Sequence, residues 1–133
     1  MMRQAVMQQV RHASGSRRLL LRSQFTDASQ HVAKLRKLAA KVVLAEDPVA
    51  HGYLSDWTGR FTQCGGAVAL PASTAEVSAL VRYCNAHRIA VVPQGGNSGL
   101  VGGSVGSNTS SAALIISLTR MNSAEHHITV DPD

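Results

Sequence analysis

The sequence predicts an α+β fold, a small parallel sheet with flanking helices, on three observations in its second half. Ser73 and Glu76 have the spacing of a capping box, in which a hydroxyl and a carboxylate serve free N–H groups where a helix begins. Short apolar runs lie before and after that helix, and this strand, helix, strand pattern is typical of a βαβ unit. A glycine-rich segment follows the second run, where ligands commonly bind in parallel sheets.

The expected helix runs from the capping box to about His87. Its apolar positions recur with the i, i+3, i+4, i+7 period of a single buried face: Val77, Leu80, Val81 and Cys84. The flanking strands are expected at residues 67–70 and 89–93, and a third strand at residues 112–118. The first two are expected to form a parallel pair.

An earlier helix is expected over residues 29–44, ending before Pro48. Its amphipathic pattern places four apolar residues inward and three lysines outward. The inward set is Val32, Leu35, Ala39 and Val42, and the outward set is Lys34, Lys37 and Lys41.

The glycine-rich segment reads P-Q-G-G-N-S-G-L-V-G-G-S over residues 93–104. Six of the 11 glycines of the chain fall between positions 95 and 106. Glycine costs backbone entropy on ordering, so such a cluster indicates positive φ or close approach to a ligand, which we expect at Gly96 and Gly103. Successive N–H groups in such a loop can bind an anion, and a phosphate is the natural candidate.

Two common phosphate sites are disfavoured by the residues present. A P-loop requires Gly-Lys-Ser/Thr, and the chain has no lysine after Lys41. The Rossmann pattern G-x-G-x-x-G requires two glycines separated by one residue, and no such pair occurs in the chain. The loop must therefore neutralise a phosphate mainly with backbone dipoles.

The same loop closely resembles the pyrophosphate-binding loop of FAD-binding domains of the PCMH type, found in the vanillyl-alcohol-oxidase superfamily. Within it the chain resembles the D-2-hydroxy-acid dehydrogenase branch, D-lactate and D-2-hydroxyglutarate dehydrogenases. Three more segments match in the order and spacing of that family: D-W-T-G-R-F at residues 56–61, L-P-A-S-T-A-E-V at residues 70–77 and I-I-S-L-T-R-M-N at residues 115–122. The resemblance covers roughly residues 33–133.

This resemblance implies that residues 27–133 are the truncated N-terminal part of an FAD-binding domain of the PCMH type. It implies a flavin-dependent enzyme that oxidises D-lactate or D-2-hydroxyglutarate to a 2-oxo acid and passes electrons to an acceptor, with the catalytic and metal-ligating residues outside this chain. The fragment alone is expected to be inactive. The implied FAD contacts are Pro93, Gln94, Gly95, Gly96, Asn97, Ser98, Gly99, Gly103 and Ser104.

The resemblance also bears on how FAD is held. Some relatives bond FAD covalently through a histidine just after the paired glycines of this loop. Here that position is Asn97, whose amide is not a nucleophile, so we expect non-covalent FAD. The Asn97 amide can instead donate and accept hydrogen bonds near the phosphates or the isoalloxazine.

Charge is divided unevenly along the chain. Residues 1–41 carry a net charge of +8, and residues 42–133 carry −3. The first 26 residues contain five arginines and no acid, a composition that predicts a mitochondrial transit peptide and a matrix or inner-membrane-associated protein. Because only this leader is basic, the composition does not predict a nucleic-acid partner, and no apolar run is long enough to span a membrane.

Other reactive residues give weaker signals. Two cysteines, Cys64 and Cys84, are too few for a metal site, and Cys84 is expected in the core. His126 and His127 are adjacent and would point to opposite faces of a strand, which disfavours shared metal ligation. Trp57 is expected to pack or to cover a flavin edge.

Two alternatives to a flavoenzyme stay open: a non-catalytic phosphate- or nucleotide-binding module with a basic leader, and a basic RNA- or membrane-surface protein.

Overall fold

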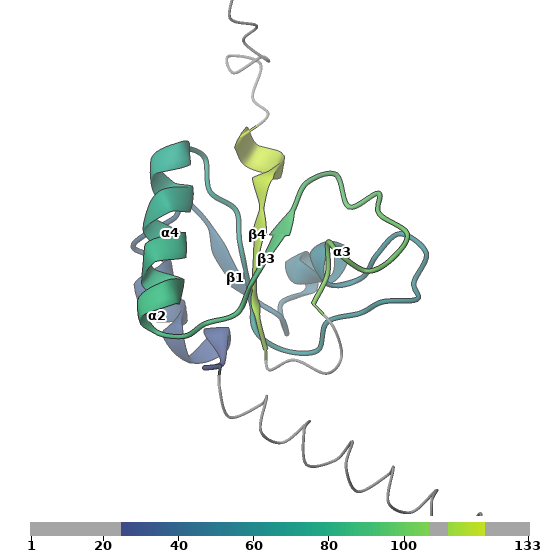
Figure 1. The fold of residues 1–133 in the computed structure, drawn as a ribbon, viewed down its shortest axis with the longest axis horizontal. Coiled ribbons are helices and arrows are strands. Elements are labelled where there is room, and N and C mark those ends of the chain that lie inside the picture. Colours follow the sequence, from purple (N-terminus) through teal and green to yellow (C-terminus); the bar gives the residue numbers. More distant parts are fainter. Residues whose placement is uncertain (1–24, 107–111, 122–133) are drawn as a thin grey trace, which may run out of the picture.

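The computed structural model describes residues 25–106 and 112–121, which form a small sheet with helices on both faces (Figure 1). Its strands are β1 (Val42–Leu44), β2 (Ala67–Ala69), β3 (Val91–Gln94) and β4 (Leu114–Ser117). Its α-helices are α2 (Val32–Leu35), α3 (His51–Leu54) and α4 (Thr74–Ala86), and its 3-10 helices are η1 (Ala28–His31), η2 (Pro48–Ala50) and η3 (Leu118–Met121).

The four strands lie in the order β1-β2-β4-β3. The three strands expected from the sequence are parallel to one another, which confirms the predicted class. The expected pairing of the first two is wrong, because β4 lies between β2 and β3 and pairs with both. The sheet is also mixed rather than wholly parallel, since β1 pairs antiparallel with β2.

One face of the sheet packs against α2 and α4, at the left of Figure 1. Successive side chains of a strand point to opposite faces, so alternate residues of β2 and β4 meet these helices. Their core contains Leu35, Leu80, Cys84, Ala67, Ala69, Leu114 and Ile116. Among the described residues, 12 buried side chains form this core and seven form the core of the opposite face, so this is the larger apolar core.

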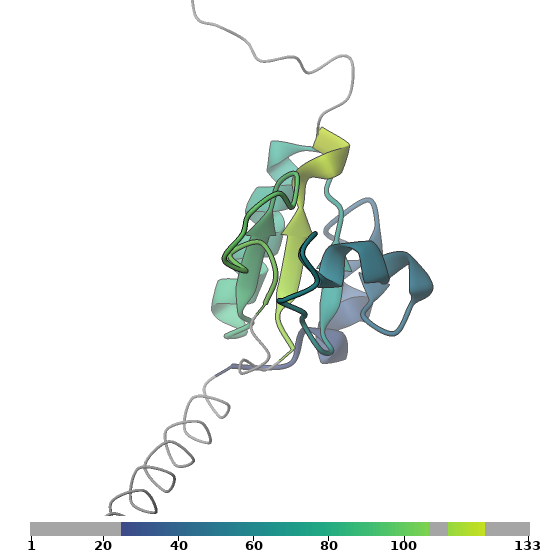
Figure 2. The ribbon, with the colours of Figure 1, turned by 90° about the vertical axis from the view of Figure 1, so that its right-hand side faces the viewer.

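The opposite face carries a smaller core beneath α3. It is formed by the remaining strand residues together with the segment that follows β1: Val43, Val68, Ile115, Ala50 and Leu54. Figure 2 views the molecule from this side, with α3 and the loop that follows β3 in front of the sheet. The segment that follows β1 and the loop that follows β3 thus lie on the same face of the sheet, which we call the α3 face.

Helix α4 begins after Ser73 as predicted, although the Glu76 carboxylate bonds the N–H of Ala72 rather than that of the N-cap Ser73. The Ser73 hydroxyl accepts a hydrogen bond from the Glu76 N–H (3.3 Å). The Glu76 carboxylate accepts from the Ala72 N–H (3.0 Å) and also from the Ala40 N–H (2.8 Å), so it ties the helix start to the turn before β1. The expected apolar face is confirmed for Leu80 and Cys84 and wrong for Val81, which is 46% exposed.

The helix expected over residues 29–44 ends much earlier, at Leu35. Val42 and Val43, with branched β-carbons that favour strands, lie in β1 and pair with Ala69 and Val68. The expected inward residues are nevertheless all buried and the three lysines exposed. Burial was predicted correctly while the secondary structure was not, because a turn and a strand can bury the same residues as a continuous helix.

Several expectations lie outside the described residues. They include nearly all of the leader at residues 1–26, His126 and His127. Both cysteines are free, Cys84 buried and Cys64 exposed. Burial raises the pKa of the Cys84 thiol to about 11. Across the described parts of the chain, no helix combines the length and apolar character of a membrane span.

Candidate functional site

The candidate site lies at the carboxyl ends of two neighbouring parallel strands. Gln94 at the end of β3 pairs with Ser117 at the end of β4. Beyond them come the glycine loop, residues 95–106, and η3. In Figure 1, η3 lies above the end of β4, and the glycine loop runs from the end of β3 out to the right. Between their first residues is a hollow of about 270 Å³ lined by Gly95, Gly96, Leu118 and Thr119. This is the position at which parallel sheets commonly bind ligands.

Four glycines leave space beside the backbone of the loop. A Cβ added at Gly95, Gly96, Gly99 or Gly103 would meet no atom within 4 Å. None of these four has positive φ, so their lack of a side chain is not required by backbone conformation. Because these four glycines have no side chains, the space beside the loop backbone is open. We call this open space the glycine cradle, and it fits a pyrophosphate held close to the main chain.

Positive φ occurs elsewhere in the loop than expected. The expectation of positive φ at Gly96 and Gly103 is wrong, and the left-handed conformations belong to Asn97 (φ 53°) and Gly102 (φ 73°). Asparagine is one of the few side chains that tolerate this region. Gly102 is also packed, since an added Cβ would lie 2.6 Å from a ring carbon of Phe61.

The loop offers main-chain donors. Among the described residues, no backbone N–H of residues 96–104 donates to a backbone carbonyl. The next residue does, since the Val105 N–H donates to the Gly102 carbonyl (3.3 Å). Unpaired amides that follow one another along a concave loop attract an anion. The residues that line the hollow carry no cationic side chain, so a phosphate bound there would be neutralised mainly by these dipoles.

Gln94 fixes the start of the loop from inside. It is only 1% exposed, and its Nε2 donates to the carbonyl oxygens of Tyr53 (2.8 Å) and Ser104 (2.9 Å). One amide thus joins β3 to α3 and to the far side of the glycine loop. The Gln94 side chain is used for contacts within the protein, so the backbone of the next residues, Gly95 and Gly96, is what faces the hollow.

Asn97 and Ser104 close the loop across its middle. The Asn97 Nδ2 donates to the Ser55 carbonyl (2.8 Å), and the Ser104 hydroxyl donates to Asn97 Oδ1 (2.6 Å). Both polar atoms of the Asn97 amide therefore bond within the protein rather than pointing into the hollow. The expected hydrogen bonds of this amide to a phosphate or an isoalloxazine stay untested, and its observed role is to shape the loop.

The neighbouring loop is organised by a single carboxylate. Asp56 is 4% exposed and accepts hydrogen bonds from the Thr58 hydroxyl and from the Phe61 N–H (2.9 Å). The hydroxyl of Thr58, followed by the Phe61 amide, holds the pKa of Asp56 below its ordinary value. The carboxylate is therefore ionised at neutral pH, and the turn it holds includes Gly59 with φ 70°.

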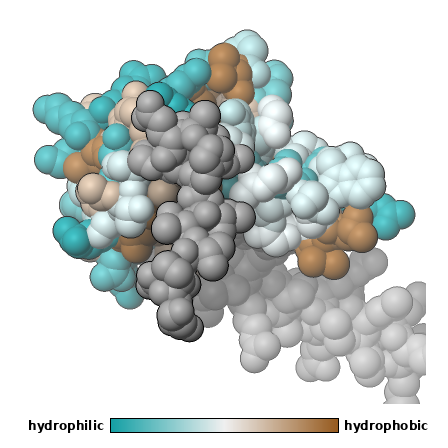
Figure 3. All heavy atoms as spheres, turned by 90° about the horizontal axis from the view of Figure 1, so that it is seen from above, coloured by the Kyte–Doolittle hydropathy of each residue, from teal (hydrophilic) through white to brown (hydrophobic). Residues whose placement is uncertain are grey.

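The tips of both loops are exposed. Trp57, Leu100 and Val101 are 66%, 63% and 83% exposed, and Arg60 and Arg120 are also at the surface. Figure 3 shows hydrophobic surface on the lobe that these loops form, at the right of the view. Trp57 is not packed in the core, which excludes the interpretation of this residue as an interior packing group.

Most of the residues expected to contact FAD lie together in this one loop, from Pro93 to Ser104. Sequence reasoning missed the opposite wall of the hollow, Leu118 and Thr119, and the anchors Tyr53, Ser55 and Phe61. The first pair could have been found, because the ends of parallel strands meet at one edge. The anchors act largely through backbone carbonyls, which carry no signal in the sequence.

Comparison with known proteins identifies the family of the chain. Residues 66–133 match the family model of an FAD binding domain, and this range includes β2, α4, β3 and the whole glycine loop. Among solved structures, an alkyldihydroxyacetonephosphate synthase has a similar fold, with a TM-score of 0.59 and 21% identity. The likeness covers 80% of this chain and 21% of the synthase.

Curated relatives are dehydrogenases of 2-hydroxy acids. A probable mitochondrial D-2-hydroxyglutarate dehydrogenase of Oryza sativa subsp. indica is 55% identical over 64 residues, 48% of this chain and 11% of that protein. A D-2-hydroxyglutarate dehydrogenase of Xanthomonas citri pv. viticola is 50% identical over 70 residues, 53% of this chain and 14% of that protein. A D-lactate dehydrogenase of Anaerostipes hadrus is 36% identical over 92 residues, 68% of this chain and 19% of that protein.

The chain thus spans between about a tenth and a fifth of the length of these relatives. The matched family covers half of the chain, and it covers the half that holds the cradle, the hollow and the loop amides. The chain belongs to the family of FAD binding domains.

Proposed function

We propose that this chain is part of a flavin-dependent oxidoreductase that converts D-lactate or D-2-hydroxyglutarate to the 2-oxo acid. The observation that carries the proposal is the glycine cradle at the carboxyl ends of β3 and β4, in a chain of the FAD binding domain family. The names of the curated relatives support the substrate class.

In this proposal the chain holds the pyrophosphate of FAD and does not itself carry the catalytic groups. The residues from Pro93 to Gly99, with Gly103 and Ser104, would bind the cofactor. Their backbone amides would be the donors, except at Pro93, which has no N–H. FAD, when bound, supplies the acceptor for a hydride from the substrate and passes the electrons on to an acceptor. The remaining cofactor and substrate contacts would come from a longer polypeptide, as the lengths of the relatives suggest.

The function is tested on the complete natural polypeptide that contains this sequence. We expect it to purify yellow and to be bleached anaerobically by D-lactate or D-2-hydroxyglutarate, but not by the L enantiomers. Comparing the two D acids then identifies the substrate. A colourless polypeptide that binds pyrophosphate would favour the non-catalytic module instead.

Non-covalent attachment of FAD has its own test. Acid precipitation of the yellow polypeptide should leave the flavin in the supernatant, because position 97 is an asparagine that cannot attack the cofactor. Flavin recovered in the pellet would contradict this part of the proposal.

We also propose that residues 1–26 direct the protein to mitochondria. The acid-free, arginine-bearing composition supports this, as do the mitochondrial names of several relatives. A fluorescent fusion of residues 1–35 should reach mitochondria, and replacing Arg11, Arg17, Arg18 and Arg22 with Glu should abolish this. A cytosolic signal from the unmodified fusion would rule the leader out.

A further inference from the structure

The glycine loop is anchored by one other stretch of the chain, residues 53–63, which we call the clamp segment. The carbonyl of Tyr53 accepts from Gln94, and the carbonyl of Ser55 accepts from Asn97. The ring of Phe61 fills the position where Gly102 lacks a side chain. At the end of the loop, Gln63 contacts Gly106 in the same way, since an added Cβ there would meet its side chain.

The clamp segment has little regular structure of its own to hold these four anchors in place. An isolated bridge pairs Ser55 with Thr62, and the Gln63 N–H donates to the Leu54 carbonyl (2.8 Å). Between these points the chain makes a turn through exposed residues such as Trp57 and Arg60. Apolar packing therefore cannot fix the turn, and its conformation depends on hydrogen bonds.

Asp56 supplies most of those bonds from the centre of the turn. Its carboxylate receives the Thr58 hydroxyl, the Thr58 N–H (3.3 Å) and the Phe61 N–H (2.9 Å). Its backbone N–H donates to the Phe61 carbonyl (3.0 Å), and its carbonyl accepts from the Gly59 N–H (3.0 Å). Phe61 is thereby bonded to Asp56 on both sides of its backbone, and Phe61 is the residue that meets Gly102.

We propose that Asp56 is a positioning residue for the FAD-binding loop, acting through the Phe61–Gly102 contact without touching the cofactor. Ionised Asp56 fixes the backbone of Phe61, the ring of Phe61 fixes Gly102, and Gly102 holds the far side of the glycine loop, whose first residues line the hollow. Hydrogen bonds to an ionised acceptor are the stronger kind, so a single carboxylate can carry this role. The cofactor part of this inference rests on the proposed function.

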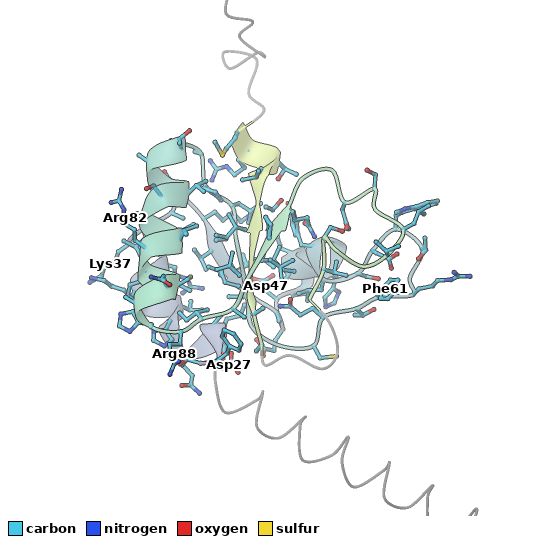
Figure 4. The ribbon with its side chains drawn as sticks, in the orientation of Figure 1. Asp27, Lys37, Asp47, Phe61, Arg82 and Arg88 are labelled. Carbon is cyan, nitrogen blue, oxygen red and sulfur yellow. The ribbon has the colours of Figure 1, made fainter. Side chains whose placement is uncertain are left out.

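The test uses the complete natural polypeptide, with Asp56→Asn against a matched control, Asp27→Asn. Asp27 likewise accepts a backbone hydrogen bond, from the Ser29 N–H (2.8 Å), but it caps η1. Figure 4 shows Asp27 at the bottom of the view and Phe61 at the right-hand end, in separate parts of the fold. Two quantities are measured: hydrogen–deuterium exchange, without flavin, of the Val105 amide, which donates to the Gly102 carbonyl, and the dissociation constant for FAD.

We expect Asp56→Asn to speed exchange of the Val105 amide, because its bond to Gly102 loosens, and to raise the dissociation constant for FAD by about tenfold or more. Asp27→Asn should change neither quantity, whatever it does to the melting temperature. A wild-type exchange rate of the Val105 amide in Asp56→Asn would overturn the proposal, and so would faster exchange with unchanged FAD affinity. If the wild type binds no flavin, the proposed function fails, and the anchoring role is still judged from exchange.

A second pair of variants serves if Asp56→Asn does not fold. Thr58→Val removes the hydroxyl that bonds to Asp56, whereas Thr58→Ser keeps it. Thr58→Val should show the same changes as Asp56→Asn to a smaller extent, and Thr58→Ser should restore wild-type exchange and affinity. Equal behaviour of the two variants would overturn the proposal.

Discussion

The two halves of this molecule are held in place by different forces. On the α2 and α4 side, regular elements bury apolar residues such as Leu80 and Leu114 against the sheet. On the α3 side, the clamp segment and the glycine loop meet through side-chain amides, backbone carbonyls and glycines. The apolar side supplies the free energy that keeps the chain folded. The α3 side buries less apolar area. Its hydrogen bonds instead fix the path of a backbone that must face a ligand.

The largest effect is expected on the apolar side. Leu80→Ala should lower the free energy of unfolding by about 2–5 kcal/mol, because it removes a fully buried side chain and leaves a cavity. Denaturant unfolding of the chain measures this loss. Val81→Ala, one residue further along α4, is the control and should cost far less because Val81 is half exposed. Equal losses would mean that this face of α4 is not the main core.

The next effect tests the contact between the two loops. Gly102→Val should cost about 2–3 kcal/mol, since a β-branched residue is strained at φ 73° and its Cβ would overlap the Phe61 ring. Gly103→Val is the control, because Gly103 has neither constraint. Melting temperatures of the two variants should therefore differ clearly. A Gly103→Val variant as unstable as Gly102→Val would contradict the described loop conformation.

A smaller loss is expected from the buried amide. Gln94→Met conserves the volume of the side chain but leaves the carbonyls of Tyr53 and Ser104 without their donor. The cost should be about 1–3 kcal/mol, the usual penalty for unpaired buried polar groups. Denaturant unfolding should show this loss, together with faster exchange of the Val105 amide, which is hydrogen-bonded within the glycine loop. Unchanged stability would mean that water replaces the amide in solution.

The smallest effect on stability accompanies the largest effect on the cofactor. Gly96→Val should change the free energy of unfolding by less than about 0.5 kcal/mol, because its side chain would enter open space. In the complete polypeptide it should abolish flavin retention, measured as the ratio of FAD to protein, because that space is the proposed cofactor site. Gly52→Val on α3 also points into open space and should keep its flavin. Flavin retained by Gly96→Val would place the cofactor elsewhere.

The sequence by itself determined the class of the fold, the position of the glycine loop after a parallel strand, and most of the buried residues. These features depend on local signals, such as the spacing of Ser73 and Glu76 or the alternation of apolar residues. Even where the expected helix over residues 29–44 was wrong, Val32 and Val42 were correctly expected to be buried, because hydrophobicity is a property of each residue.

Only the tertiary structure decided which glycine of the loop is conformationally required and what holds the loop in shape. Gly96 and Gly103 look like Gly102 in the sequence, but only Gly102 has positive φ and a ring beside it. The order of the strands was decided in the same way, since β4 enters between β2 and β3. The physical reason is that these features depend on backbone atoms of distant segments, which every residue carries and no residue type reveals.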